Sequence, residues 1–158
     1  MRELNIEDRD RELISLATAL IRRRYAPIRH HVAAVVMASS GAIYQGVHVG
    51  WGRVNLCAEQ IAFANALAEG ESKFITCAAV MARAPSGETS VVSPCGTCRE
   101  MLQFFAPDLT VLVHDKGQIA KTYIADLLPA PWVPLSAGNY PELSKSGTSE
   151  NVATWKCM

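Results

Sequence analysis

The feature that most constrains this chain is a pair of short cysteine motifs, Cys57-Ala58-Glu59 and Pro94-Cys95-Gly96-Thr97-Cys98. Zinc prefers sulfur and nitrogen ligands in a tetrahedron, and three protein ligands leave one position open for a water, whose pKa the metal lowers to about 7. Glu59 follows Cys57 by two residues, so it can lie near that water without binding the metal, as a general acid or base must. The spacing therefore predicts a catalytic zinc site with Cys57, Cys95 and Cys98 as ligands, and the fold has to bring the two motifs together.

Two other interpretations of the cysteines stay open. Cys77 lies in a continuous apolar run, 74–82, that we expect to be a strand buried on both faces. As a fourth ligand Cys77 would close the site and make the zinc structural, but free cysteine is also a common small buried hydrophobe, and a structural site gives no reason for Glu59. A thiol oxidoreductase could use Cys95 and Cys98 at a helix start, which leaves Cys57 and Glu59 unexplained.

Composition limits the size of the fold and the class of partner. A chain of 158 residues with 49% apolar content is long enough for one packed domain, which we expect at 1–133. The composition changes after Trp132, and 134–158 is expected to be an extended or disordered tail. Lys and Arg number 15, as do Asp and Glu, so no basic field favours a nucleic acid and a free small molecule is the expected partner.

The sequence contains neither a signal-like start nor an apolar run of about 18 residues, which predicts a cytoplasmic protein without a membrane span. Five cysteines is an odd number, and three of them stand at metal-ligand spacing, which in a reducing compartment favours metal binding over disulfides.

Apolar periodicity and turn residues predict alternating helices and strands in a three-layer α/β fold. Both cysteine motifs fall at helix starts, where the positive end of the helix dipole favours thiolates. Gly50, Gly52 and Asn55 indicate a loop before the first of these helices. The expected helices are 6–24, 57–69, 95–105 and 124–128, and the expected strands are 32–38, 42–49, 74–82, 109–114 and 119–123.

Several charged and titratable side chains allow a functional and a structural interpretation. The run Arg22 to Arg24 could bind phosphate, but cations at a helix C-terminus usually form a solvated face. Arg53 and Arg99 are candidates to balance the negative zinc–thiolate cluster. His30, His31 and His48 could each be ligands, although a lone histidine is more often a hydrogen-bonded structural residue.

The segments Asn55 to Gln60 and Ser93 to Glu100 resemble the cytidine deaminase family, most of all its small three-cysteine branch, which includes blasticidin S deaminases. The similarity runs from about His31 to Trp132, and its last part, from Asp126, resembles the Leu-Leu-Pro segment that closes the family's domain. The resemblance implies a three-layer α-β-α fold with a mixed five-stranded sheet and a Zn²⁺ cofactor on Cys57, Cys95 and Cys98.

The same resemblance implies hydrolytic deamination of a free cytosine-like nucleoside or base, in which water attacks the amino-bearing ring carbon and ammonia is released. Glu59 would shuttle the protons, while the Ala58 N–H and the Ser93 carbonyl would hold the base. Three-cysteine members are usually homotetramers, and Trp132 stands where an aromatic residue reaches a neighbouring subunit's pocket.

The sequence also departs from the family around the sugar. The family's Asn-x-Glu, which hydrogen-bonds the ribose, is His48-Val49-Gly50 here, an expected aromatic is His30, and the residue after Glu59 is Gln60 where Arg is frequent. We therefore expect cytidine to be a poorer substrate than another aminated ring, such as blasticidin S with its altered sugar, or isocytosine. The alternative is that His30 or Arg53 has taken over the sugar contact.

Overall fold

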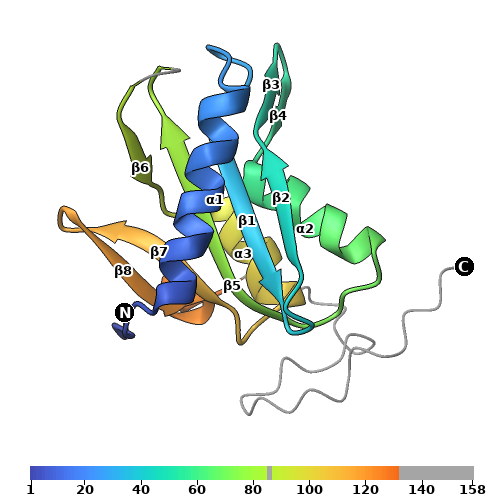
Figure 1. Ribbon diagram of the computed structural model, residues 1–158. Helices are drawn as coiled ribbons and strands as arrows, with labels where there is room; N and C mark the ends of the chain where they lie inside the picture. The colour runs from blue at the N-terminus through green and yellow to red at the C-terminus, as the bar shows by residue number, and fades with distance from the viewer. Residues whose placement is uncertain (85–86, 132–158) are drawn as a thin grey trace, which may run out of the picture.

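A mixed β-sheet forms the centre of the protein in the computed structural model, which describes residues 1–84 and 87–131. Its strands follow the order β2-β1-β5-β7-β8, and β6 pairs with the C-terminal end of β5 (Figure 1). Among the strands of this sheet in the described residues, β5 and β7 run parallel and the other pairs are antiparallel. The strands are β1 (Val32–Ala38), β2 (Ile43–Val47), β5 (Phe74–Ala82), β6 (Thr89–Val91), β7 (Thr110–Asp115) and β8 (Gln118–Tyr123).

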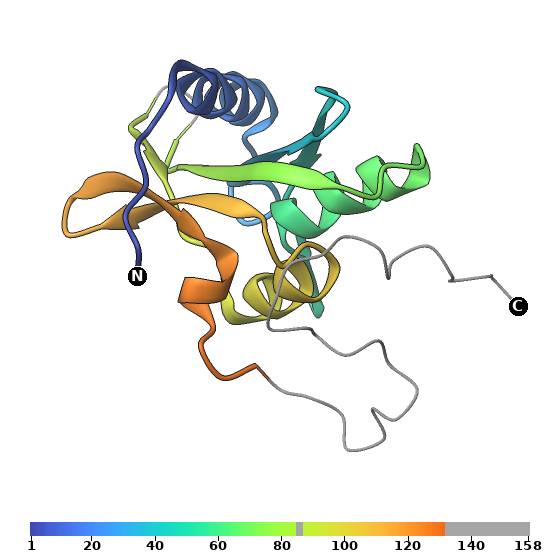
Figure 2. The ribbon, with the colours of Figure 1, turned by 90° about the horizontal axis from the view of Figure 1, so that it is seen from below.

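Helices cover both faces of this sheet and complete three layers. Helix α1 (Asp8–Arg24) lies on one face, and α2 (Ala58–Ala68) and α3 (Gly96–Phe105) lie on the other (Figure 2). Each face has its own buried apolar cluster, because residues alternate between the two faces along β1 and β5. The expected α/β architecture with a mixed sheet is confirmed, with β6 as a short addition to the five strands of the main path.

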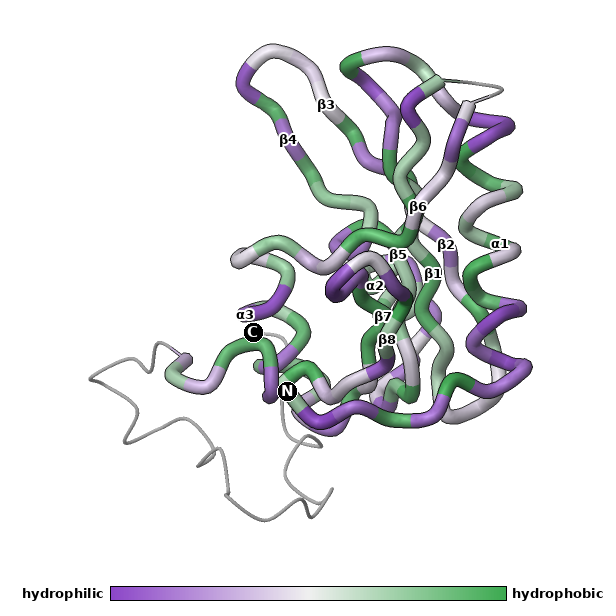
Figure 3. The backbone as a smooth tube through the Cα atoms, turned by 90° about the vertical axis from the view of Figure 1, so that its left-hand side faces the viewer, coloured by the Kyte–Doolittle hydropathy of each residue, from purple (hydrophilic) through white to green (hydrophobic). Residues whose placement is uncertain are grey.

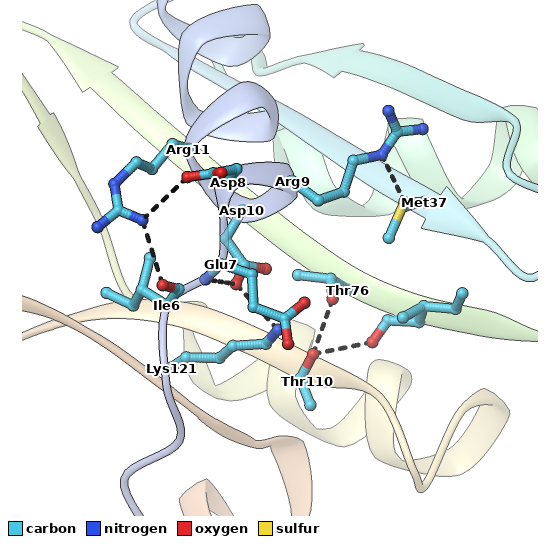
Figure 4. Close-up of polar contacts among 11 residues, drawn as sticks. Ile6, Glu7, Asp8, Arg9, Asp10, Arg11, Met37, Thr76, Thr110 and Lys121 are labelled. Atoms are coloured by element: carbon cyan, nitrogen blue, oxygen red, sulfur yellow. Dashed lines mark hydrogen bonds and ion pairs between the residues drawn. The ribbon is translucent and has the colours of Figure 1, made fainter.

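Helix α1 is fixed to the sheet by a buried ion pair as well as by its apolar side. Lys121 Nζ on β8 donates to Asp10 Oδ2 at 2.9 Å, and the two side chains are only 11% and 2% exposed (Figure 4). The other Asp10 contact defines the helix start, because the Glu7 N–H donates to Asp10 Oδ2 at 2.8 Å. The helix therefore begins at Asp8, two residues later than the apolar pattern predicts.

The segment with Gly50, Gly52 and Asn55, expected to be a loop, is instead a separate hairpin. Strands β3 (Val49–Trp51) and β4 (Val54–Leu56) pair antiparallel and project beyond the sheet (Figure 3). The turn between them contains Gly52 at φ +55°, a backbone conformation that favours glycine. The expected strand 42–49 is thus divided, since β2 ends at Val47 and Val49 belongs to β3.

The chain after β8 forms a 3₁₀ turn, η1 (Ile124–Leu127), where a helix to 128 was expected. Trp132 and the tail at 134–158 lie outside the described residues, so their expected roles remain predictions. Within the described residues, no helix combines the length and the apolar character that crossing a membrane requires.

Candidate active site

Two helix N-termini bring the three motif cysteines together. Cys57 is the N-cap of α2, Cys95 is the N-cap of α3, and Cys98 lies in the first turn of α3. Their three Sγ atoms all lie within 4.8 Å of one another, and Cys57 Sγ is 3.5 Å from Cys95 Sγ. Three sulfurs bound to one zinc ion at about 2.3 Å are separated by similar distances, so this donor set fits zinc.

The start of α2 is fixed by two local features. Gln60 Oε1 accepts a hydrogen bond from the Cys57 N–H at 3.0 Å, which satisfies one of the free donors at the helix start. Gly46 on β2 lies against the same turn, since a Cβ at this position would be 2.3 Å from Ala58 O and from Ala62 N. The strand can approach the helix backbone so closely only because residue 46 is glycine.

The thiols of the metal-free protein do not favour ionisation together. Burial raises the pKa of Cys57 to about 11, with the hydrogen bond to Cys95 as a further cause, and burial also raises the pKa of Cys98. For Cys95, burial acts to raise the pKa, but hydrogen bonds from the Cys98 backbone and from the Cys57 and Cys98 thiols outweigh it and the pKa is lowered. A cation bound between the three thiols would favour their ionised forms, as a metal site does.

Glu59 occupies the second position of α2 and is buried, with 6% of the residue exposed. Burial raises the pKa of its carboxyl group, so a proton is held more firmly there than on a carboxyl in water. Glu59 lines a cavity of about 10 Å³, together with residues that include Cys77, Pro94 and Leu102. This volume is about the minimum that holds one water molecule.

Cys77 and His48 do not belong to the metal-competent group. Within residues 1–84 and 87–131, that group consists of Cys57, Cys95 and Cys98. Cys77 is 3% exposed on β5, and its burial raises the pKa of the thiol. The described residues thus bring together three side chains that could bind a metal, the number that leaves an open position, and give no support to a closed structural site with Cys77.

Two of the predicted substrate residues, His30 and His48, lie together beside β3. His30 Nδ1 is 2.7 Å from the His48 backbone oxygen, and the ring centroids of His48 and His31 are 4.2 Å apart. His48 Nε2 lies 2.6 Å from Asn55 Oδ1 on β4. The sequence predicts only a loop at Asn55 and gives no sign of this contact, because two glycines interrupt the side-chain alternation of the hairpin at 49–56.

The remaining candidates are two residues expected to hold the base and two arginines expected to balance the charge of the zinc site. Ala58 is buried at the first position of α2, and Ser93 is half-buried with its Oγ donating to His114 O at 3.5 Å. Arg99 Nε donates to Pro94 O at 2.9 Å and another guanidinium nitrogen donates to Leu127 O at 3.3 Å, so Arg99 joins the second motif to η1. Arg53 is exposed at the tip of the β3–β4 hairpin.

Comparison with known proteins assigns the chain to a family. A family model for the zinc-binding region of cytidine and deoxycytidylate deaminases matches residues 7–120. The chain belongs to this deaminase family. A blasticidin-S deaminase from Bacillus cereus is 40% identical over 136 residues, which are 82% of this chain and 96% of the relative.

Solved structures of cytidine deaminases have the same fold. The enzyme from Bacillus anthracis has a TM-score of 0.67 and 26% identity, covering 77% of this deaminase and 88% of that chain. The enzyme from Burkholderia pseudomallei has a TM-score of 0.62 and 30% identity, covering 77% of this deaminase and 98% of that chain. The family and the relatives make this protein a zinc-dependent hydrolytic deaminase, and its cysteine cluster is a group that could hold the zinc.

Proposed function

We propose that this enzyme hydrolyses the C–N bond to the amino group of a free cytosine-like nucleoside or base, with Cys57, Cys95 and Cys98 holding zinc and Glu59 moving the protons. The observation that carries the proposal is the position of Glu59. It is buried in the first turn of α2, two residues beyond one proposed ligand and on the same helix start. A proton carrier for this reaction needs to be close to the metal without being bound to it.

Zinc and Glu59 have different roles in the proposed reaction. Zinc supplies Lewis-acid chemistry, which makes a water reactive enough to attack at neutral pH. Glu59 takes a proton from the attacking water, passes it to the ring nitrogen, and delivers a proton to the departing amino group, which leaves as ammonia. The raised pKa of its carboxyl supports this role, because a group that both accepts and donates protons works best with a pKa near the operating pH.

Backbone groups beside the two motifs are proposed to hold the base. Ala58 is the first residue of α2, and its N–H is one of the donors that a helix start leaves without an intrahelical partner. Ser93 lies two residues before Cys95, and the buried Pro94 separates them. The Ala58 N–H and the Ser93 carbonyl would give the base one hydrogen-bond donor and one acceptor next to the zinc.

The substrate is proposed to be a nucleoside whose sugar differs from ribose, with blasticidin S as the leading candidate. His48 and Gly50 replace the family's ribose-binding Asn and Glu. A side chain at Gly50 would collide with its surroundings, since a Cβ there would be 2.7 Å from His48 Cε1 and from Ile28 O. A carboxylate is therefore incompatible with this arrangement, and the relative from Bacillus cereus is named for blasticidin S.

Ammonia release by the zinc-loaded enzyme tests the substrate. We would compare cytidine, cytosine, blasticidin S and isocytosine by kcat/KM. We expect kcat/KM for blasticidin S to exceed that for cytidine, because a site without the family's Asn and Glu loses part of its preference for the ribose hydroxyls. A kcat/KM for cytidine far above that of every other compound would contradict the substrate assignment while leaving the deaminase chemistry intact.

The enzyme is also proposed to act in the cytoplasm as a homotetramer in nucleoside metabolism, without nucleic-acid or membrane partners. The apolar side chains of the β3–β4 hairpin support assembly, because Val49, Trp51, Val54 and Leu56 are 37–67% exposed on one face of the ribbon. Such a surface is typical of a protein contact.

Trp132 is proposed to cover the substrate of an adjacent subunit. The Trp132→Ala variant should then raise KM more than it changes zinc content, and sedimentation should give a tetramer for the wild type. A fully active monomer would contradict both the assembly and this role.

A further inference from the structure

His48 is held in one orientation by its surroundings. Its Nε2 lies 2.6 Å from Asn55 Oδ1, its ring lies 4.2 Å from that of His31, and its backbone oxygen contacts His30 Nδ1 at 2.7 Å. The residue is 7% exposed. Gly50 leaves the space that the ring needs, because a Cβ there would be 2.7 Å from His48 Cε1.

The other ring nitrogen of His48 is buried, and among residues 1–84 and 87–131 it has no hydrogen-bond partner. Because the oxygen of Asn55 can only accept, the contact at 2.6 Å requires the hydrogen of the neutral ring to be on Nε2. Nδ1 then carries a lone pair. A buried acceptor without a partner is rare in proteins and calls for a specific explanation, such as a ligand or water.

His48 lies on the face of the sheet that α2 covers. The His48 N–H donates to Val32 O at 2.9 Å, so the chain continues the pairing of β2 with β1 as far as this residue. Residues two apart in an extended chain point to the same face, and Gly46 lies against Ala58 O and Ala62 N of α2. His48 therefore lies on the side of the sheet that carries Cys57 and Glu59.

We infer that Asn55 is a positioning residue that holds His48 as the Nε2–H tautomer, so that Nδ1 accepts a hydrogen bond from a donor group on the ring substituent of the substrate. This inference rests on the proposed function and narrows it. The substrate class is an aminated pyrimidine whose substituent bears a hydroxyl or an amino group close to the ring. A free base has no such group and would not use His48.

The tautomer is measured without turnover. Nitrogen NMR of the His48 ring in the zinc-loaded wild type, at a pH where the ring is neutral, should give a protonated Nε2 and an unprotonated Nδ1. The Asn55→Leu variant should give a mixture of the two tautomers, and Asn55→Asp, which keeps an oxygen acceptor, should restore the Nε2–H form. A wild-type ring with its proton on Nδ1 would overturn the inference.

Kinetics test the role of Nδ1 and identify the donor. Asn55→Leu should raise KM by about 3- to 10-fold for the preferred substrate, as expected for one neutral hydrogen bond, with kcat nearly unchanged. KM for free cytosine should not change. If KM of Asn55→Leu rises for cytidine but not for a dideoxy analogue of cytidine, the donor is a sugar hydroxyl. If KM rises for blasticidin S alone, the donor belongs to the substituent of blasticidin S.

Asn65→Leu is the matched control. Asn65 lies on α2 and its Nδ2 donates to Gln45 O at 2.9 Å, and loss of this hydrogen bond should leave KM unchanged. An unchanged KM for every substituted substrate in Asn55→Leu would overturn the inference while the deaminase proposal stands. If the wild type released no ammonia from any compound, the proposed function would fail, and the NMR result would still decide the tautomer.

Discussion

Cys57 Sγ and Cys95 Sγ lie 3.5 Å apart although 38 positions separate them in the sequence, and each cysteine is the N-cap of its helix. The two helix starts therefore meet at their thiols. In the absence of a cation, burial is the main cause that raises the pKa of Cys57 and of Cys98. Zinc bound here would join α2 to α3, so the metal should contribute to the stability of the fold as well as to catalysis.

Removing one ligand should remove the metal. Cys98→Ala is expected to reduce zinc from about one ion per chain to well below that, measured by elemental analysis after dialysis. Zinc at about 1,000 times its Kd stabilises a native state by about 4 kcal/mol, so zinc should raise the Tm of the wild type and have little effect on this variant. Cys77→Ala is the control and should keep its zinc, because Cys77 lies outside the cluster. Full occupancy in Cys98→Ala would exclude Cys98 as a ligand.

The contact between Gly46 and α2 should be sensitive to a single methyl group. In Gly46→Ala the new Cβ would meet two backbone atoms of the helix at 2.3 Å, which cannot be relieved by a side-chain rotation. We expect a loss of about 1–3 kcal/mol in the free energy of unfolding, measured in urea. Gly96→Ala meets nothing within 4 Å and should not destabilise the metal-free protein. Equal stability of the two variants would show that the close approach is not required.

The buried pair of Asp10 and Lys121 gives a further prediction. Asp10→Ala leaves the Lys121 ammonium buried without its partner, and the cost should be about 3–5 kcal/mol in the free energy of unfolding. Glu12→Ala removes the exposed pair of Glu12 with Arg9 and should cost about 0–1 kcal/mol. Unfolding of both variants by heat or urea measures the two losses. Similar small losses of unfolding free energy in Asp10→Ala and Glu12→Ala would mean that the buried ion pair contributes no more to stability than the exposed one.

The local patterns of the sequence predicted that Cys57, Cys95 and Cys98 would meet, and their Sγ atoms lie within 4.8 Å of one another. Ligand spacing and position at a helix start are short-range properties of the chain, so both motifs can be found without the fold. The roles of the cysteines as ligands and of Glu59 as proton carrier stay predictions. The larger helices and strands were also located within a few residues, since their apolar periodicity is regular.

The contacts of His48 could not be predicted in the same way. Its partner Asn55 is brought to it by the β3–β4 hairpin, whose strands are only three residues long and contain Gly50. Short strands with glycine give no clear alternation, so the segment has the composition of a loop. The close approach at Gly46 and the pair of Asp10 with Lys121 depend on sheet order and on three-dimensional packing, which the order of elements along the chain leaves undetermined.

Glu59 is proposed to move protons without holding the metal, and Glu59→Gln tests this directly when both zinc content and ammonia release are measured. We expect full zinc occupancy with turnover lowered by roughly 10² to 10⁴, the contribution of a positioned general acid or base. Glu100→Gln, an exposed change two residues from Cys98, should keep both properties. Near-normal turnover in Glu59→Gln would remove Glu59 from the proton transfers, and loss of zinc would show that Glu59 helps to hold the metal.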